Sequence, residues 1–192
     1  QEVQVTAHLV GPKRSVLAMK ALQDGYVAAD VVDMILDLRP ETPAQDVLEI
    51  AHAIARWTRN AGRMPSATPN EPGRLWVRPE VMAALIDHES GFNPRARSAT
   101  NDHGLCQLHG KPIYEIGGNI QVGVMHLAGC MRAAGGNERQ ALACYNGGGS
   151  PPPSSYRYAD CILAAANRLR GGAPCEASGG PGSGSPIGST QF

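Results

Sequence analysis

The residue most suggestive of chemistry in this chain is Glu89, because its carboxylate shares a face of an expected helix with apolar side chains. Met82, Leu85 and Ile86 precede Glu89 at intervals that place all four on one side of a helix. Apolar surroundings disfavour the charged form of a carboxylate and raise its pKa. A carboxyl group with a raised pKa suits general-acid chemistry near neutral pH. The spacing therefore predicts a general acid, against the alternative of a glutamate that simply ends a helix.

A second carboxylate is harder to find. A carboxyl group that acts as an acid is often paired with a second carboxylate that acts as a base or nucleophile. Asp87 is two residues from Glu89 and points to a different face of the helix. Asp102 and Glu115 fall in expected loops and are available for such a role, although neither belongs to a motif.

A metal centre is not expected. His88, His103 and His109 show neither an HExxH pattern nor another paired ligand spacing. They are therefore interpreted as surface or turn histidines, and no cofactor is expected.

The chain has five cysteines, so at least one is unpaired. None has the spacing of a zinc site, and we expect them to be small core residues. Cys161 lies on an apolar helical stripe and Cys130 on a neighbouring expected helix, so a bridge between them is one possibility. A cysteine amidase built on Cys106 or Cys144 is disfavoured, because neither lies in a recognisable nucleophile setting.

Apolar periodicity indicates a mainly α-helical chain. Thr42, Pro43 and Gln45 form a helix-start signature, and Pro79 starts the helix that carries Glu89. The expected elements are an extended arm at 1–10, a helix that starts at Pro79 and ends near Glu89, and further helices at 15–22, 26–38, 43–60, 119–134, 138–145 and 153–170.

Five short motifs follow Pro79 in an order that resembles the soluble lytic transglycosylase family, which has a goose-type-lysozyme-like fold. The motifs are Glu89-Ser90-Gly91-Phe92-Asn93-Pro94 with the isolated Ser98, Gly104-Leu105-Cys106-Gln107-Leu108, Asn119-Ile120-Gln121-Val122-Gly123, Ala143-Cys144-Tyr145-Asn146-Gly147-Gly148, and Tyr158.

The resemblance implies a reaction that needs one carboxyl group. Family members cleave the β-1,4 bond between N-acetylmuramic acid and N-acetylglucosamine in peptidoglycan without water. The glutamic acid, here Glu89, protonates the leaving oxygen and then removes the proton of the muramoyl 6-hydroxyl, which closes a 1,6-anhydro ring.

The resemblance also implies supporting roles. Ser98 is expected to bond the carboxylate or the peptide-bearing sugar, Gln107 to line the groove, and Tyr145 with Asn146 to hold acetamido and hydroxyl groups. Tyr158 is expected to orient the glutamate. Each has a structural alternative, as a turn cap, a partner of buried backbone or a core residue.

Two tryptophans precede the catalytic helix. The helix at 43–60 is expected to pack on the helix that carries Glu89, as in the resembled fold, and this makes Trp57 a core residue. Trp76 is interpreted as a hydrophobic anchor in preference to a saccharide-stacking ring.

The expected organisation is a helical and extended annex at 1–42, a lysozyme-like domain at 43–170 with a loop insertion at 61–77, and a Gly/Ser/Pro-rich tail at 171–192. Gln1 stands where an initiator Met is usual, which predicts either a removed leader or a processed or trimmed chain.

Net charge argues against nucleic acid as a partner, because 17 basic residues balance 17 acidic ones. No apolar run is long enough to span a bilayer. Without a basic surface to attract it to the anionic wall, the chain is expected to be delivered by envelope or virion assembly partners through the annex and the tail.

The sequence thus favours a lytic transglycosylase that acts on peptidoglycan glycan strands in the bacterial envelope or periplasm, or from a phage virion. Two alternatives stay open: a hydrolytic muramidase on the same fold, and a weakly active structural or glycan-binding component of a virion or secretion apparatus.

Overall fold

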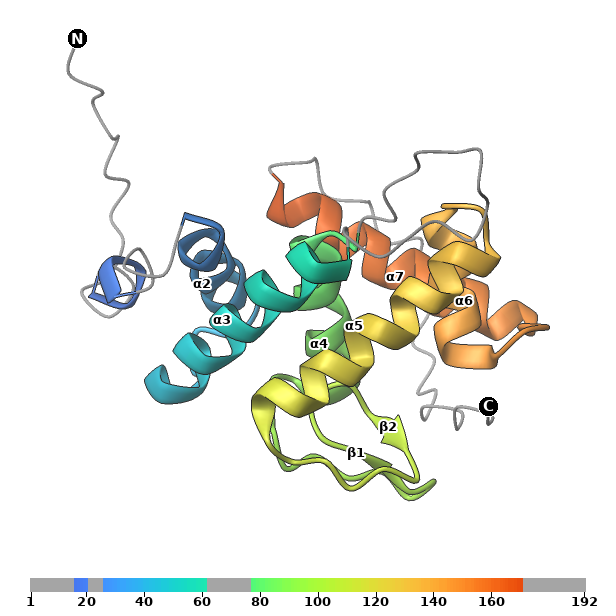
Figure 1. Ribbon diagram of the computed structural model, residues 1–192, viewed down its shortest axis with the longest axis horizontal. Coiled ribbons are helices and arrows are strands. Elements are labelled where there is room, and N and C mark those ends of the chain that lie inside the picture. Colours follow the sequence, from blue (N-terminus) through green and yellow to red (C-terminus); the bar gives the residue numbers. More distant parts are fainter. Residues whose placement is uncertain (1–15, 21–25, 62–76, 171–192) are drawn as a thin grey trace, which may run out of the picture.

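In a computed structural model, the chain is described at residues 16–20, 26–61 and 77–170. These ranges form a mainly helical structure with one small hairpin (Figure 1). The helices are α2 (Tyr26–Leu38), α3 (Ala44–Ala61), α4 (Pro79–Ser90), α5 (Ile116–Ala133), α6 (Glu138–Gly147) and α7 (Pro153–Leu169), and residues 16–20 form a further helical turn.

Local sequence fixes the helix ends around the site. Pro79 occupies the first turn of α4, and Gly91 ends that helix in the left-handed conformation with φ 58°. Both oxygens of Glu115 accept hydrogen bonds from the first backbone N–H groups of α5. The Asn137 side chain caps α6 in the same way through the N–H of Gln140.

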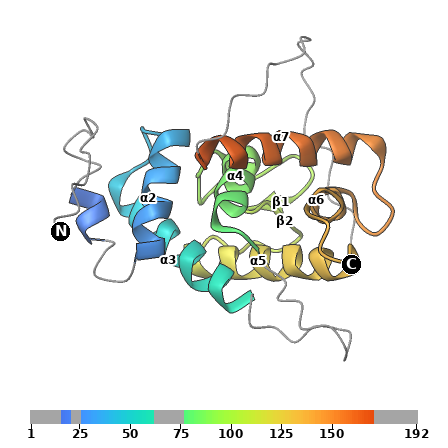
Figure 2. The same cartoon turned by 90° about the horizontal axis from the view of Figure 1, so that it is seen from above.

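The helices share one hydrophobic core. Figure 2 shows α5 and α7 along opposite sides of the molecule, with α4 and α6 between them. Helix α4 packs against α7 and α2, and α6 connects α5 to α7. The buried side chains of α2 that belong to this core are Ala28, Ala29, Val31, Val32, Ile35 and Leu36.

Helix α3 packs differently from the prediction. It touches α4, but it lies mainly against α5 and α2. Its buried stripe includes Val47, Ile50 and Ile54, so the apolar face was predicted correctly. The helices that cover most of this face are α5 and α2, and not α4. Trp57 packs partly buried against the core, which confirms its interpretation as a core residue.

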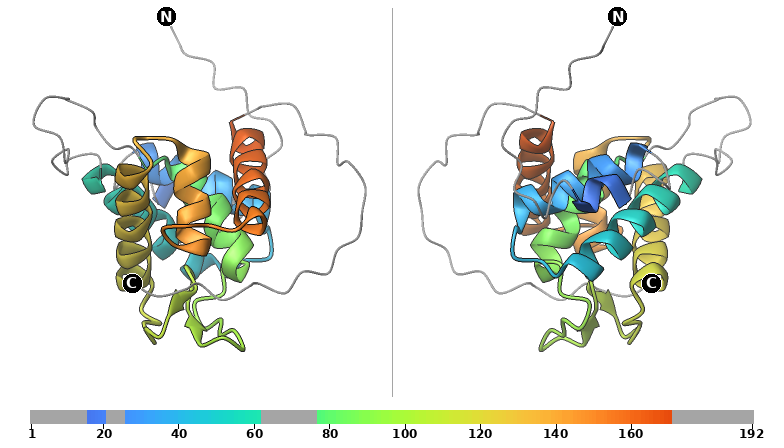
Figure 3. Two further views of the ribbon diagram at one scale, coloured as in Figure 1. Left: turned by 90° about the vertical axis from the view of Figure 1, so that its right-hand side faces the viewer. Right: turned by 90° about the vertical axis from the view of Figure 1, so that its left-hand side faces the viewer.

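The segment between α4 and α5 projects from one end of the helices and carries the hairpin (Figure 1, Figure 3). Strand β1 (Asp102–His103) pairs antiparallel with β2 (Leu108–His109), with Asp102 opposite His109 and His103 opposite Leu108. The turn between the strands needs glycine at 104, where φ is 74° and a Cβ atom would collide with the Asn119 amide.

Asn119 anchors this turn to α5. Its Oδ1 accepts the N–H of Cys106 at 2.8 Å, and its Nδ2 donates to the carbonyls of Ile113 at 2.8 Å and His103 at 3.1 Å. The side chain is buried, so these bonds satisfy backbone groups that water does not reach. Asn119, the first residue of the third sequence motif, therefore has a structural role.

Cys130 does not pair with Cys161, the bridge that the sequence left open. Cys130 pairs with Cys144, which joins α5 to α6 with a Cα–Cα distance of 5.8 Å. Cys161 is exposed on α7, because Ala159 and Ile162 form the side of that helix that is buried in the core. Cys106 is buried, as expected for a core cysteine.

The helix assignments are otherwise close to prediction. Helix α2 has the expected bounds, α4 begins at Pro79, and α5 begins three residues early because Glu115 caps it. No helix in the described ranges is long and apolar enough to cross a membrane. The predicted arm at 1–10, the break near 24–25, Trp76, most of the 61–77 insertion, Cys175 and the 171–192 tail lie outside the described residues.

Candidate active site

Glu89 lies in the last turn of α4 and faces α7. Its side chain is partly buried, and its Oε1 accepts a hydrogen bond of 2.5 Å from the hydroxyl of Tyr158. The His88 ring packs edge-on against the Tyr158 ring, with centroids 5.0 Å apart. The structure thus brings together the two residues predicted as acid and orienting tyrosine.

The surroundings of Glu89 raise its pKa to about 7. Burial is the main cause, and the negative charge of Asp102 raises the pKa further, whereas the hydrogen bond from Tyr158 lowers it. A carboxyl group with this pKa exists in both protonation states near neutral pH. It can therefore release a proton and accept one in the same pH range.

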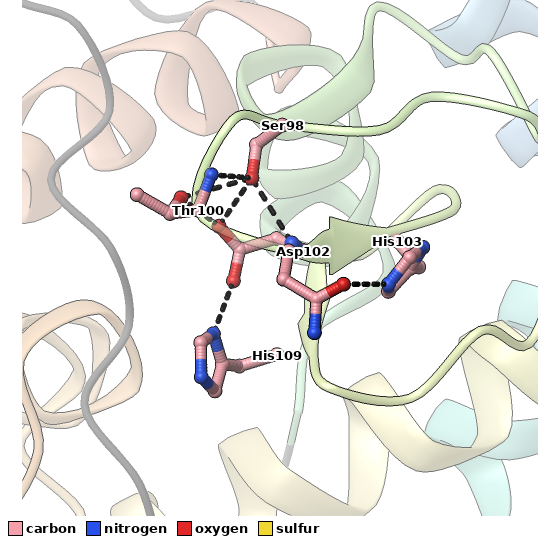
Figure 4. Close-up of polar contacts among 6 residues, drawn as sticks. Ser98, Thr100, Asp102, His103 and His109 are labelled. Atoms are coloured by element: carbon pink, nitrogen blue, oxygen red, sulfur yellow. Dashed lines mark hydrogen bonds and ion pairs between the residues drawn. The ribbon is translucent and has the colours of Figure 1, made fainter.

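Ser98 bonds to Asp102 across the turn that precedes β1 (Figure 4). The Ser98 hydroxyl donates to Oδ2 of Asp102 at 2.6 Å, and the Thr100 hydroxyl donates to the same oxygen at 2.5 Å. The N–H of Asp102 donates back to the Ser98 oxygen at 3.0 Å. The structure therefore shows a bond from the Ser98 hydroxyl to Asp102, and the implied contact with the peptide-bearing sugar stays a prediction.

Asp102 is buried, and both of its carboxylate oxygens have partners. Oδ1 lies 3.0 Å from Nδ1 of His109, which comes from the opposite position on β2. From the sequence, Asp102 was expected to be a loop residue without a motif. The signal was the Ser98, Thr100, Asp102 spacing, because hydroxyl and carboxyl groups two residues apart in a turn readily bond to one another.

Glu115, the other candidate for a second carboxylate, caps the N-terminus of α5. Its oxygens accept the N–H of Gly117 at 2.8 Å and that of Gly118 at 2.5 Å, which caps α5. Asp102 is thus the better placed of the two carboxylates to influence Glu89.

The predicted substrate-binding residues other than Ser98 and Tyr158 have internal partners. Gln107 donates from Nε2 to the carbonyl of Gly104 at 2.9 Å and has a φ of 45°. Oδ1 of Asn146 accepts a hydrogen bond of 2.8 Å from Ser155. Gln107 and Asn146 keep part of their surface exposed, so these bonds orient the two amides without enclosing them.

Tyr145 is buried, and its hydroxyl donates to the carbonyl of Cys106 at 2.9 Å. The His126 ring lies 4.6 Å from the Tyr145 ring, between centroids. The charge of Glu89 contributes to the raised pKa of both Tyr145 and Cys106, although burial is the main cause for each. Tyr145 is therefore a core residue whose hydroxyl binds the turn that contains Cys106.

A thiol nucleophile does not fit this arrangement. Cys144 is in the disulfide, and burial raises the pKa of the Cys106 thiol, which keeps it protonated. Gly123 provides the space for Cys106, because a Cβ atom at position 123 would lie 2.5 Å from its sulfur. Cys106 is therefore a packing residue.

Of the three histidines weighed as metal ligands, His103 and His109 bond within the hairpin segment, and His88 is exposed. The two ring nitrogens of His103 form hydrogen bonds with Oδ1 of Asn101 and with the Tyr114 hydroxyl. His103 is buried, whereas the sequence suggested a surface or turn position. Among the described residues, no group of three or more His, Cys, Asp or Glu side chains could hold a metal ion.

A charged hollow of about 520 Å³ lies between α2, α4 and α7, next to Glu80 at the start of α4. Glu89 is at the other end of that helix, so the hollow is separate from the site described above. The hollow is lined by Asp30, Asp33, Met34, Asp37, Arg78, Glu80, Leu169 and Arg170.

No solved structure gave a significant match to the chain. Residues 73–159 match the family model of the Transglycosylase SLT domain, a span that includes Glu89, the hairpin and Tyr158. Residues 73–159 therefore form a domain of the soluble lytic transglycosylase family, which acts on peptidoglycan and has a mainly α, lysozyme-like fold.

Proposed function

We propose that this chain is a peptidoglycan lytic transglycosylase in which Glu89 acts first as an acid and then as a base. The observation that carries the proposal is the position of Glu89, which is partly buried, bonded by Tyr158 and has a pKa of about 7. One carboxyl group with these properties is sufficient for a reaction that uses no water.

In the first step, protonated Glu89 donates its proton to the glycosidic oxygen between N-acetylmuramic acid and N-acetylglucosamine. The bond from this oxygen to the muramoyl C1 breaks, and N-acetylglucosamine leaves with the proton. Because Tyr158 donates to Oε1, we assign the proton transfer to Oε2 of Glu89. The reaction leaves Glu89 ionised beside an electron-deficient sugar.

In the second step, ionised Glu89 accepts the proton of the muramoyl 6-hydroxyl, and the O6 atom bonds to C1. The product is a 1,6-anhydro ring, and the glutamic acid regains its starting state. The hydrogen bond from Tyr158 stabilises the ionised form between the two steps.

The remaining predicted residues are proposed to shape the sugar site. Ser98 is held by Asp102, and Gln107 and Asn146 offer partly exposed amides for acetamido and hydroxyl groups. Tyr145 is proposed to act indirectly, by fixing the Cys106 carbonyl in the same turn.

A hydrolytic muramidase is the second candidate, and the observation that favours it is Asp102. Its charge acts on the Glu89 carboxyl group, so it lies where a second carboxylate could activate water. Against this role, its oxygens already accept bonds from Ser98 and Thr100 and lie beside His109.

Peptidoglycan as the substrate implies action in the bacterial envelope, reached from the periplasm or from a phage virion. The disulfide between Cys130 and Cys144 is consistent with an oxidising compartment.

The test is mass spectrometry of the muropeptides released from purified sacculi by the native chain and by Glu89→Gln. We expect anhydromuropeptides from the native chain and none from the variant. Reducing-end products would identify a muramidase and direct attention to Asp102. No release from either protein would contradict the enzymatic proposal and favour a structural or glycan-binding role.

A further inference from the structure

We propose that Arg39 is a positioning residue that holds the last turn of α4 and thereby the carboxyl group of Glu89. Arg39 precedes the span that matches the family, which begins at residue 73. The inference rests on the catalytic role of Glu89 proposed above. It assigns a function to the connection between α2 and α3, which lies in the expected annex at 1–42.

Arg39 contacts the end of α4 at two points. Its Nε donates to Oδ1 of Asp87 at 2.5 Å. Its guanidinium also lies over Gly91, since a Cβ atom there would be 3.8 Å from the Arg39 Cζ. Asp87 and Gly91 are themselves joined by a backbone hydrogen bond of 2.9 Å that closes the last turn of the helix.

A cation at this position suits the end of a helix. The last carbonyl groups of a helix carry partial negative charge, which a nearby guanidinium stabilises. Arg39 therefore restrains the turn that contains Glu89 through the Asp87 side chain and through the electrostatics of the helix end. The exposure of Arg39 limits the contribution of the pair to global stability.

The backbone of Arg39 is fixed before its side chain reaches α4. Its N–H donates to the carbonyl of Ile35 at 2.7 Å. Its own carbonyl accepts the N–H of Thr42 at 3.1 Å and the Thr42 hydroxyl at 2.8 Å. Thr42 is buried, so these bonds fix the backbone of Arg39 in the turn between α2 and α3.

The opposite side of the same helical turn is held by α7. Tyr158 bonds Glu89 and packs against the ring of His88. Three consecutive residues of α4, from Asp87 to Glu89, are thus held by two elements that are distant in sequence. Helix ends open more easily than helix centres, so the loss of Arg39, with the Tyr158 bond intact, should expose Glu89 to water. Exposure should lower its pKa toward the ordinary value, because burial is the main cause of the raised pKa.

The experiment compares Arg39→Ala with Arg39→Lys and with a matched control, Arg139→Ala. Arg139 also donates from Nε to an aspartate at the surface, Asp160, at 2.6 Å, but this pair joins α6 to α7 and lies away from the last turn of α4. Thermal unfolding of each variant checks that any effect on activity is not a loss of folded protein.

For Arg39→Ala we expect kcat for the release of anhydromuropeptides to fall by about tenfold with little change in KM, since small displacements of a catalytic group are costly. The pH–rate profile should move to lower pH with the pKa of Glu89. Lysine keeps the charge without the guanidinium geometry, so Arg39→Lys should recover part of the activity. Arg139→Ala should retain native kcat and the native profile.

The route through Asp87 is tested by a double-mutant cycle. If Arg39 acts through Asp87, Arg39→Ala combined with Asp87→Ala should reduce kcat no more than the larger of the single effects. Effects on kcat that multiply would contradict this route.

A titration of Glu89 by carbon-13 NMR separates this inference from the proposed function, because it requires no turnover. A lower pKa for Glu89 in Arg39→Ala, with a native pKa in Arg139→Ala, supports the positioning role even if sacculi release nothing. An unchanged pKa and an unchanged kcat in Arg39→Ala would overturn it.

Discussion

The hydroxyl of Tyr158 donates a hydrogen bond of 2.5 Å to Oε1 of Glu89, which joins α7 to the last turn of α4 across 69 residues of sequence. The bond favours the ionised carboxylate, whereas burial favours the protonated acid. The balance between these two effects keeps the pKa of Glu89 near neutrality. An acid that must also serve as a base requires such a balance.

Tyr158→Phe should therefore raise the pKa of Glu89 above its native value of about 7, because the bond that lowers this pKa is removed. The pH–rate profile should move to higher pH. The rate at the optimum should fall by about tenfold or more, since a hydrogen bond to a charged group is lost. Steady-state rates across pH on glycan strands provide the measurement.

Tyr156→Phe is the matched control for this prediction. Tyr156 lies on the same helix, where its ring packs against Arg139. A shift of equal size in the profile of Tyr156→Phe would mean that the Tyr158 result reports a general change in α7.

Asp102→Asn should lower the pKa of Glu89, because the nearby negative charge that raises it is removed. The activity profile should then move to lower pH, while the products remain anhydromuropeptides. Asp160→Asn, at an exposed site on α7, is the control. If Asp102→Asn abolished release and the native products had reducing ends, Asp102 would instead be the base of a muramidase.

The raised pKa of Glu89 also predicts how stability depends on pH. The folded protein holds this proton with a pKa of about 7, against an ordinary value of 4.5. The group therefore contributes stability that is fully present below pH 4.5 and is lost as the pH rises through 7. The contribution is on the order of 3 kcal/mol.

Glu89→Gln lacks this proton equilibrium, so it should gain stability relative to the native chain as the pH rises from about 4 to about 8. Urea unfolding of both proteins at several pH values in this range is the measurement. A constant difference in the free energy of unfolding would show that the Glu89 pKa is not raised by folding.

Loss of the disulfide should destabilise the protein without displacing Glu89. Cys130 and Cys144 are 14 residues apart, and a loop of this length corresponds to about 3 kcal/mol of stabilisation. The double variant Cys130→Ser/Cys144→Ser should unfold at lower urea concentration than the native chain and match the reduced native protein. Cys161→Ser, at an exposed thiol, should unfold like the native chain, and native stability of the double variant would contradict the pairing.

Local sequence determined the helices and the face on which Glu89 lies. Met82, Leu85 and Ile86 are buried on α4 as their spacing predicted, because helical periodicity depends on neighbouring residues alone. Pro79 and Gly91 fixed the two ends of that helix for the same reason. The pairing of Glu89 with Tyr158 was predicted as well, but from the order of the family motifs and not from periodicity.

Tertiary structure alone decided which side chains meet. Ser98 bonds Asp102, Cys130 bonds Cys144, and Arg39 reaches Asp87 from a segment that sequence assigned to an annex. Periodicity predicts which face of a helix is apolar. It does not predict which neighbouring helix covers that face or which path the connecting segments take. Such contacts depend on how helices pack and on where their connecting turns lie, so they became visible only in the folded chain.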